Sequence, residues 1–393
     1  MNTASLAASY LRARPLQTAL SLLLLALGAG TIVTLLLVVG QLEGRMGRDA
    51  RGIDLVVGAK GSPMQLILAG IYHADAPAGN IPLSAVAFVE KNRMVKKAIP
   101  LALGDSWKGY RIVGAGKEYL EQYEASFSSG KMYENEMEAV LGHEVAQRTG
   151  AGVGARFAGA HGLGGEGEEH AEAYTVTGVL ARTGSVMDRL VLTSIESVWE
   201  VHEHGQGGKK EAEREVTVVL LQYASPLAAA TLPRQVNAQS GLQAASPAYE
   251  TARLFRIVGT GVEALRAFAV VLMLAAGLSV FIALYTALEE RRYDLAVMRT
   301  LGASPARLFG LLLAEGLVLA LAGATLGLLL GHALASVLGA WLDAQQQYPV
   351  SGLVFHPAEV WVLAAALGVG LMAALLPAWR AYRTDVAGTL SRG

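Results

Sequence analysis

The sequence predicts a membrane protein with four transmembrane α-helices and a large mixed α+β extracytoplasmic domain between the first and second helices. Apolar residues make up 53% of the 393-residue chain and charged residues only 17%, whereas about 25% charged is usual for soluble domains. Mean hydropathy is +0.39. Four segments nearly free of charge are each long enough for a helix to cross the ~30 Å hydrocarbon core of a bilayer. A long stretch of mixed, charged sequence separates the first from the second.

The apolar segments and the charged stretches between them divide the chain into nine parts. We expect a cytoplasmic N-terminal segment over 1–16, a first transmembrane helix over 17–42, an extracytoplasmic α+β domain over 43–265, a second helix over 266–288, a cytoplasmic coupling helix and turn over 289–307, a third helix over 308–342, a short extracytoplasmic loop over 343–359, a fourth helix over 360–380 and a cytoplasmic tail over 381–393. The first apolar run exceeds the 7–15 residues typical of a signal peptide core, so we expect it to stay in the membrane.

Basic residues near the helix ends predict the orientation. Arg12 and Arg14 precede the first helix, the 289–307 loop carries several arginines, and the 343–359 loop has neither Lys nor Arg. Both termini and the 289–307 loop are therefore expected in the cytoplasm. Three arginines just after the first helix oppose this orientation, but long domains are translocated largely regardless of charge.

The charge balance, the absence of cysteine and two incomplete sequence motifs exclude several functions. With 32 basic and 33 acidic residues the net charge is -1, and there is no cysteine. Neither a field that attracts nucleic acid nor a thiolate metal site is expected. Glu118 stands where a phosphate-binding loop needs Ser or Thr, and Gln147 replaces the second His of an HExxH zinc motif. Because no catalytic set is complete, we expect a non-enzymatic chain, and ATP hydrolysis would need a partner.

The predicted outer domain contains several β-type runs. They begin at Ile53, Tyr110, Ala173, Arg189 and Glu215. Helices are expected around 119–126 and 227–237. Two Gly-rich tracts interrupt these elements and contain His161, His170, His202 and His204. Imidazoles beside carboxylates suit Zn²⁺, but the spacing matches no defined site, so we assign no metal ligands and interpret the tracts as solvated loops, with metal binding as the alternative.

The third apolar helix has an unusual pattern of small and ionisable residues. Gly323, Gly327 and Gly331 follow one another at four-residue steps, which predicts a seam where another helix approaches closely. Glu315 lies in the same helix, either as a functional group in the membrane or hydrated near the interface, and both interpretations stay open. For His332 we favour a structural role.

The segment EERRYDLAVMRTLGASPAR, from Glu289, predicts a short helix, a tight turn and a second helix. Its expected apolar stripe consists of Tyr293, Ala296, Val297, Thr300 and Leu301. Gly302 is suited to end the helix in a left-handed conformation. Ser304 and Pro305 are suited to the N-cap and first position of the next helix. Two interpretations stay open at this point: a helix among lipid headgroups, or a docking element for a cytoplasmic partner.

The same segment resembles the loop after the second membrane helix of FtsX-like ABC permeases, the group that includes macrolide-exporter and lipoprotein-release permeases. LLPAWRAYRTDVAGTL, from Leu375, resembles the end of the family's last helix. IDLVVGAKGSPMQLILAGIYH, from Ile53, and AVLGHEVAQRTGAGVGARF, from Ala139, resemble elements of its extracytoplasmic domain. The resemblance covers nearly the whole chain except the two His-containing tracts.

The resemblance implies a permease of the bacterial inner membrane that pairs as a homodimer or heterodimer and binds two copies of a separate ABC ATPase. That ATPase would hold ATP and Mg²⁺, and this chain no cofactor. The coupling residues implied by the resemblance are Glu290, Arg291, Arg292, Leu295, Met298, Arg299, Leu301, Gly302 and Ala303. Leu295 and Met298 would supply apolar contacts and the arginines charged ones. The glycine seam would pack against another helix of the dimer.

Three functions follow as hypotheses. The leading one is an ATP-driven permease whose outer domain exports or extracts a lipoprotein, peptide, lipid or drug. The second is a transmembrane regulator that activates an extracytoplasmic partner without transport. The third is a metal-linked export complex. Expected partners include membrane lipid and a periplasmic adaptor or substrate protein, but no nucleic acid.

Overall fold

The computed structural model describes residues 14–162, 169–203, 214–344 and 350–383. Most of the predicted N-terminal segment and nearly all of the C-terminal tail therefore lie outside the described residues. The chain forms two compact units. One unit contains residues 1–42 and 258–393, and the other contains residues 43–257.

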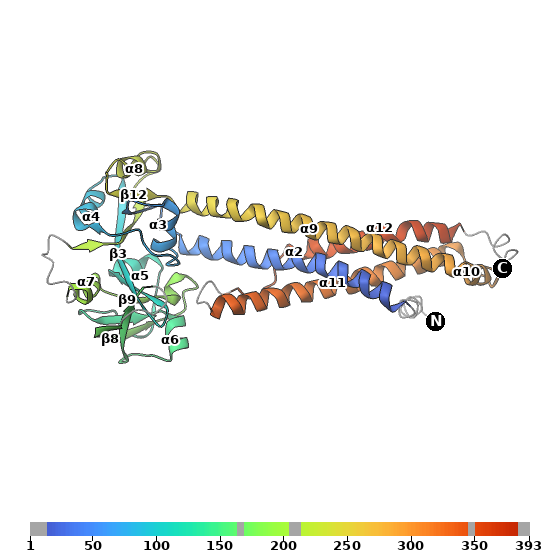
Figure 1. The fold of residues 1–393 in the computed structure, drawn as a ribbon, viewed down its shortest axis with the longest axis horizontal. Helices are drawn as coiled ribbons and strands as arrows, with labels where there is room; N and C mark the ends of the chain where they lie inside the picture. Colours follow the sequence, from blue (N-terminus) through green and yellow to red (C-terminus); the bar gives the residue numbers. More distant parts are fainter. Residues whose placement is uncertain (1–13, 163–168, 204–213, 345–349, 384–393) are drawn as a thin grey trace. The chain divides into compact units, whose positions relative to one another are not determined.

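Four helices are long and apolar enough to cross a membrane. They are α2 (Pro15–Asp49), α9 (Pro247–Glu290), α11 (Pro305–Ala344) and α12 (Glu359–Tyr382), coloured blue, yellow, orange and red in Figure 1. A short helix, α10 (Arg292–Thr300), connects α9 to α11. The predicted architecture, four transmembrane helices with one large domain between the first two, is confirmed. Helices α2 and α9 continue well beyond the apolar spans, because the sequence after 42 and before 266 keeps helix-forming residues.

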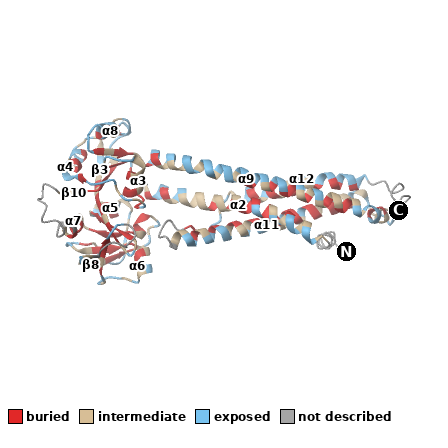
Figure 2. Ribbon diagram, in the orientation of Figure 1, coloured by how far each residue is buried: buried red, intermediate tan, exposed pale blue. Residues whose placement is uncertain are grey.

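Small residues and buried polar contacts hold the helical unit together, and Figure 2 shows how buried residues alternate with exposed ones along each helix. A Cβ placed on Gly316 of α11 would lie 2.6 Å from the Cβ of Ala374 on α12. The Nε2 of His332 lies 3.1 Å from a carboxylate oxygen of Glu359 at the start of α12. His332 therefore joins α11 to α12, in agreement with the structural role expected for it.

The second unit is built on one mixed sheet with the strand order β12-β1-β11-β3-β4-β9-β6-β8-β5, and β7 pairs with β3 and β8. Its strands are β1 (Leu55–Ala59), β3 (Val95–Trp107), β4 (Tyr110–Ala115), β5 (Phe127–Gly130), β6 (Glu138–Leu141), β7 (Arg156–His161), β8 (Glu169–Leu180), β9 (Val191–Thr193), β11 (Val218–Tyr223) and β12 (Leu242–Ala245). The β4–β9 and β6–β8 pairs are parallel and the other pairs antiparallel. Strands β2 (Ile81–Pro82) and β10 (Glu215–Val216) pair separately.

Short helices flank this sheet and complete two apolar cores. They are α3 (Pro63–Gly70), α4 (Leu83–Glu90), α5 (Lys117–Gln122), α6 (His143–Thr149), α7 (Ile195–Glu203) and α8 (Ala228–Asn237), with a 3₁₀ turn at Val186–Arg189. One core gathers residues such as Leu55, Leu221 and Val236. The other includes Leu141 and Val176. Strands form at all five predicted places, and α5 and α8 form where helices were expected.

Candidate functional site

The connection between α9 and α11 forms a helix, a tight turn and a capped helix start. Only Arg291 separates α9 from α10. Gly302 has a φ of +97°, a left-handed conformation that glycine adopts at little cost. The Oγ of Ser304 accepts a hydrogen bond from the backbone N–H of Arg307 at 3.3 Å, and Pro305 is the first residue of α11. The predicted turn and cap are confirmed.

One face of α10 packs against the transmembrane helices. Leu295 and Ala296 are buried, and Leu295 belongs to a cluster with Leu288 of α9 and Leu308 of α11. Met298 packs against the same cluster and is half-buried. The expected direct contact of Leu295 with a partner is therefore corrected: this side chain is used inside the helical unit, because three apolar helices meet there.

Large side chains are exposed in the first turn of α10 and at its C-terminal end. Tyr293 is 54% exposed and Leu301, at the C-cap, is 82% exposed. These two residues stand at the ends of the expected apolar stripe, and only Ala296, near its middle, is fully buried. Arg292 forms an exposed ion pair with Glu289 at 3.1 Å. We call Arg292, Tyr293 and Leu301 the outer face of α10.

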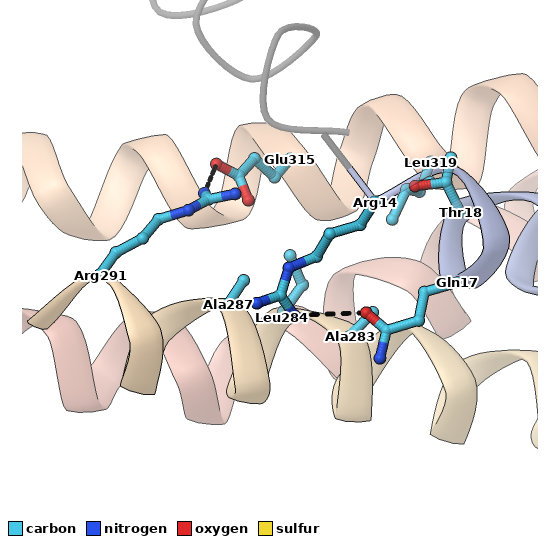
Figure 3. A pocket seen from close by; sticks show the side chains of 9 residues that line it. All are labelled: Arg14, Gln17, Thr18, Ala283, Leu284, Ala287, Arg291, Glu315 and Leu319. Carbon is cyan, nitrogen blue, oxygen red and sulfur yellow. Dashed lines mark hydrogen bonds and ion pairs between the residues drawn. The ribbon is translucent and has the colours of Figure 1, made fainter. Parts of the chain in front are cut away.

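Two ion pairs connect the helix ends around α10. Arg14, just before α2, pairs with Glu290 at the end of α9. An Nη1 of Arg291 lies 3.4 Å from an Oε1 of Glu315 in α11, and Figure 3 shows the two side chains reaching toward each other. A small pocket beside these pairs is lined by residues from α2, α9 and α11 and by Arg14 and Arg291. They are Arg14, Gln17, Thr18, Ala283, Leu284, Ala287, Arg291, Glu315 and Leu319.

Glu315 is a buried carboxylate, with only 2% of its surface exposed. Its pairing with Arg291 places a compensating charge beside it within the protein, which argues against the hydrated interpretation. Leaving such a charge without its counter-charge costs several kcal/mol. A displacement of Arg291 at the start of α10 is therefore coupled to α11. Sequence spacing did not show this pair, because 24 residues separate its members.

Glu290 and Arg291, both expected to contact a partner, thus form ion pairs within the chain. Arg299 and Ala303 are half-buried. The structure gathers all nine predicted coupling residues at one end of the helical unit, around the α9–α10–α11 connection. Of these nine, Glu290, Arg292, Leu301 and Gly302 are exposed, and two of them, Arg292 and Leu301, belong to the outer face.

The glycine seam packs within the chain. A Cβ on Gly327 would lie 2.7 Å from the Cβ of Ala29 on α2. Gly323 and Gly331 meet Leu25 and Val33 in the same way, so four-residue steps on the two helices match. The expected role as a helix-packing seam agrees with these contacts, and the helix that the seam meets is α2 of the same chain, where small residues permit close backbone approach.

The structure brings together two of the four histidines of the Gly-rich tracts. His161, at the end of β7, and His170, in β8, both approach the carboxylate of Asp105 in β3 at 3.3 Å. The side chain of His202 and all of His204 lie outside the described residues. Asp105 was missed by sequence reasoning, because its place beside the histidines depends on strand pairing across more than 50 residues.

Sequence models of two protein domains match the chain. The FtsX-like permease C-terminal domain matches residues 266–386, and the MacB-like periplasmic core domain matches residues 18–239. Curated proteins show no significant match.

Two solved structures show similarity to part of this chain. The periplasmic region of MacB from Actinobacillus actinomycetemcomitans is 11% identical, with a TM-score of 0.35, and the match covers 52% of this chain and 95% of that one. The extracellular domain of the noncanonic ABC-type transporter YknZ from Gram-positive bacteria is 12% identical, with a TM-score of 0.31, and the match covers 49% of this chain and 98% of that one.

The two domain-model matches and the four apolar helices define a multi-pass ABC transporter permease. The chain belongs to the FtsX-like permease family and carries a MacB-like periplasmic core domain. Membership in this family implies an ABC transporter context with ATPase partners.

Proposed function

We propose that this chain is the permease subunit of an ABC transporter complex and that a separate ATPase docks on the outer face of α10. The exposure of Tyr293 and Leu301 supports this proposal most directly, because α10 is otherwise fixed to the helical unit by Leu295. Large apolar side chains that stay exposed beside arginines are typical of protein interfaces.

ATP-driven closure of the ATPase would push on this face. The push would be transmitted through Leu295 and the Arg291–Glu315 pair to α9 and α11. Because α9 runs from Pro247 to Glu290 as one helix, a shift at its C-terminal end would be carried along its length toward the outer domain. The motion of that domain would then export or extract a substrate on the far side of the membrane.

Orientation and stoichiometry complete the proposal. Both termini and α10 would face the cytoplasm of a bacterium, since the arginines cluster at that end. Two permease subunits would bind two ATPases, and the ATP and Mg²⁺ would be held by the ATPases. A periplasmic adaptor or substrate protein would bind the outer domain.

The test is to isolate the chain from its native membrane in mild detergent and to measure co-purifying ATPase and ATP hydrolysis. We expect an ABC ATPase to co-purify with the wild-type chain and to be lost with Leu301→Glu. Leu353→Glu is the matched control, because Leu353 is also highly exposed but lies in the loop before α12. Retention of the ATPase by Leu301→Glu would contradict the docking proposal. If cargo is transferred, the complex is a transporter, whereas a co-purified enzyme that needs the ATPase for activity would instead favour regulation.

A further inference from the structure

Three potential metal ligands meet at one edge of the outer domain, and the proposed docking on α10 has no part in the argument from them. Asp105 comes from β3, His161 from the end of β7 and His170 from the start of β8. The Nδ1 of His161 and the Nε2 of His170 each lie 3.3 Å from Oδ1 of Asp105. One ligand atom from each residue lies within 4.8 Å of the other two.

The strand pairing explains why these residues converge. Asp105 is the direct partner of His161 in the β3–β7 pair. The β7–β8 pair then brings Ala160 opposite Glu169, next to His170. The β3–β4 ladder is irregular between Leu103 and Ser106, and such irregularities turn a strand and its side chains aside from the regular pleat. Figure 1 shows β3 and β8 in this domain.

Two of the distances between the ligand atoms suit a tetrahedral metal ion. Zn²⁺ binds imidazole nitrogen and carboxylate oxygen at about 2.0–2.2 Å, so two ligand atoms at a tetrahedral angle lie about 3.4 Å apart. The two separations of 3.3 Å match this value. They are longer than the ~2.9 Å typical of an N–H···O hydrogen bond.

The surroundings also fit a small cation site. Exposure rises from 1% for the side chain of Asp105, through 10% for His170, to 56% for His161, so an ion can reach a buried carboxylate from the surface. Gly159 leaves room beneath the cluster, since a Cβ there would lie 2.9 Å from Ile112 and within 4 Å of Asp105 and His170.

Arg111 places a positive charge near the proposed ligand Asp105. Burial lowers the pKa of Arg111 to about 10, while Asp75 and Asp105 oppose the shift. Its Nη2 donates a hydrogen bond of 2.7 Å to the backbone carbonyl of Asp75, which directs that nitrogen toward the carbonyl. The competing explanation is that Asp105 serves only to balance Arg111 and the histidines.

We propose that Asp105, His161 and His170 bind a divalent transition-metal ion, with Zn²⁺ as the best fit to two imidazoles and one carboxylate. Three protein ligands leave one position for water or for a group from another molecule. A bound ion joins the end of β7 and the start of β8 to β3, and thereby stabilises this edge of the sheet. Because all three proposed ligands belong to this chain, no partner is needed to complete these three metal contacts.

The test measures Zn²⁺ binding to the full-length chain in nanodiscs by competition with a chromophoric chelator. We expect one Zn²⁺ per chain with micromolar or tighter affinity. Loss of a second-sphere partner already weakens metal sites 10–100-fold, so His170→Ala and Asp105→Asn should weaken binding by at least about 100-fold. His143→Ala, on α6 of the same domain, is the matched control and should bind as the wild type does.

Substitution of the buried Asp105 or of His170 can disturb folding. The His161→Ala variant and a zinc X-ray absorption spectrum therefore provide a second test. His161 is the most exposed ligand, so His161→Ala should fold and still lose the affinity. X-ray absorption at the zinc edge should show two imidazole ligands in the wild type. No Zn²⁺ binding by the wild type would overturn the proposal, and so would His161→Ala and His170→Ala variants that bind Zn²⁺ as tightly as the wild type. Either result would leave a buried charge cluster as the explanation.

Discussion

The guanidinium of Arg291 lies 3.4 Å from the carboxylate of Glu315, and this pair joins the first residue before α10 to the interior of α11. Glu315 is almost fully buried, so the pair is maintained only while α10 keeps its position. A helix that presents Tyr293 and Leu301 outward is thus connected inward to the transmembrane helices.

Glu315→Gln should destabilise the helical unit, because it removes the charge that offsets Arg291 in a buried setting. Breaking a buried pair costs about 3 kcal/mol or more. Glu289→Gln is the control, since its exposed pair with Arg292 contributes about 0–1 kcal/mol. Thermal unfolding of both variants in nanodiscs checks the prediction. Equal unfolding temperatures would contradict the prediction, because the buried Glu315 pair would then contribute no more stability than the exposed Glu289 pair.

Gly302→Val should distort the α10–α11 turn and uncouple ATP hydrolysis from function. A β-branched residue at a φ of +97° carries backbone strain of about 1–3 kcal/mol. Space is not the limitation, because nothing lies within 4 Å of a Cβ at this position. Gly310→Val is the control, since Gly310 lies within α11 and also has open space around it. The cargo-dependent stimulation of ATP hydrolysis should fall only for Gly302→Val, and unchanged coupling in an assembled complex would contradict the assignment.

Gly327→Val should loosen the contact between α2 and α11. Even a Cβ at this position would lie 2.7 Å from Ala29 and 3.1 Å from the backbone oxygen of Ala26, and overpacking typically costs about 1–3 kcal/mol. Gly368→Val on α12, where nothing lies within 4 Å, is the control. We expect a lower unfolding temperature for Gly327→Val alone. If dimer assembly fell while the unfolding temperature did not, the seam would belong to the dimer after all.

The outer domain should lose stability as pH falls below about 6.5, because His73 is buried in its neutral form. Burial, with positive charges on Arg111 and Arg189, lowers the pKa of His73 to about 3. The unfolded state binds a proton near pH 6.5 and the folded state does not, so stability is complete above 6.5 and falls by up to about 1.4 kcal/mol per pH unit between 6.5 and 3.

His73→Gln should remove this part of the pH dependence. The Nε2 of His73 hydrogen-bonds the hydroxyl of Tyr119 at 3.0 Å, and a Gln amide can make a similar bond. Urea unfolding at pH 7 and pH 5, followed by hydrogen exchange of outer-domain peptides, measures the change. The same pH slope in both proteins would mean that His73 is protonated in the folded state.

Much of the architecture was predictable, because long apolar spans and a left-handed glycine are local properties of the sequence. Strand β3 was missed, although it pairs with β11, β4 and β7 at the centre of the sheet. Lys96, Lys97, Pro100 and Gly104 interrupt its apolar alternation, and only burial by neighbouring strands overrides this weak local preference.

The candidate sites were predictable only in part, because contacts between distant residues decide them. Leu295 was assigned outward, but the meeting of α9, α10 and α11 buries it. The seam glycines were correctly expected to receive a helix, yet the sequence alone did not show which one. Asp105 gave no signal, because only strand pairing places it beside His161.

Crosslinking from Leu301 in native membranes tests the central proposal most directly. A photoreactive residue at 301 should form an adduct with an ABC ATPase, whereas one at 353, where Leu353 is 93% exposed, should not. An ATPase adduct from 301 alone would support docking on the outer face of α10. No ATPase adduct from 301, or equal adducts from both positions, would contradict it.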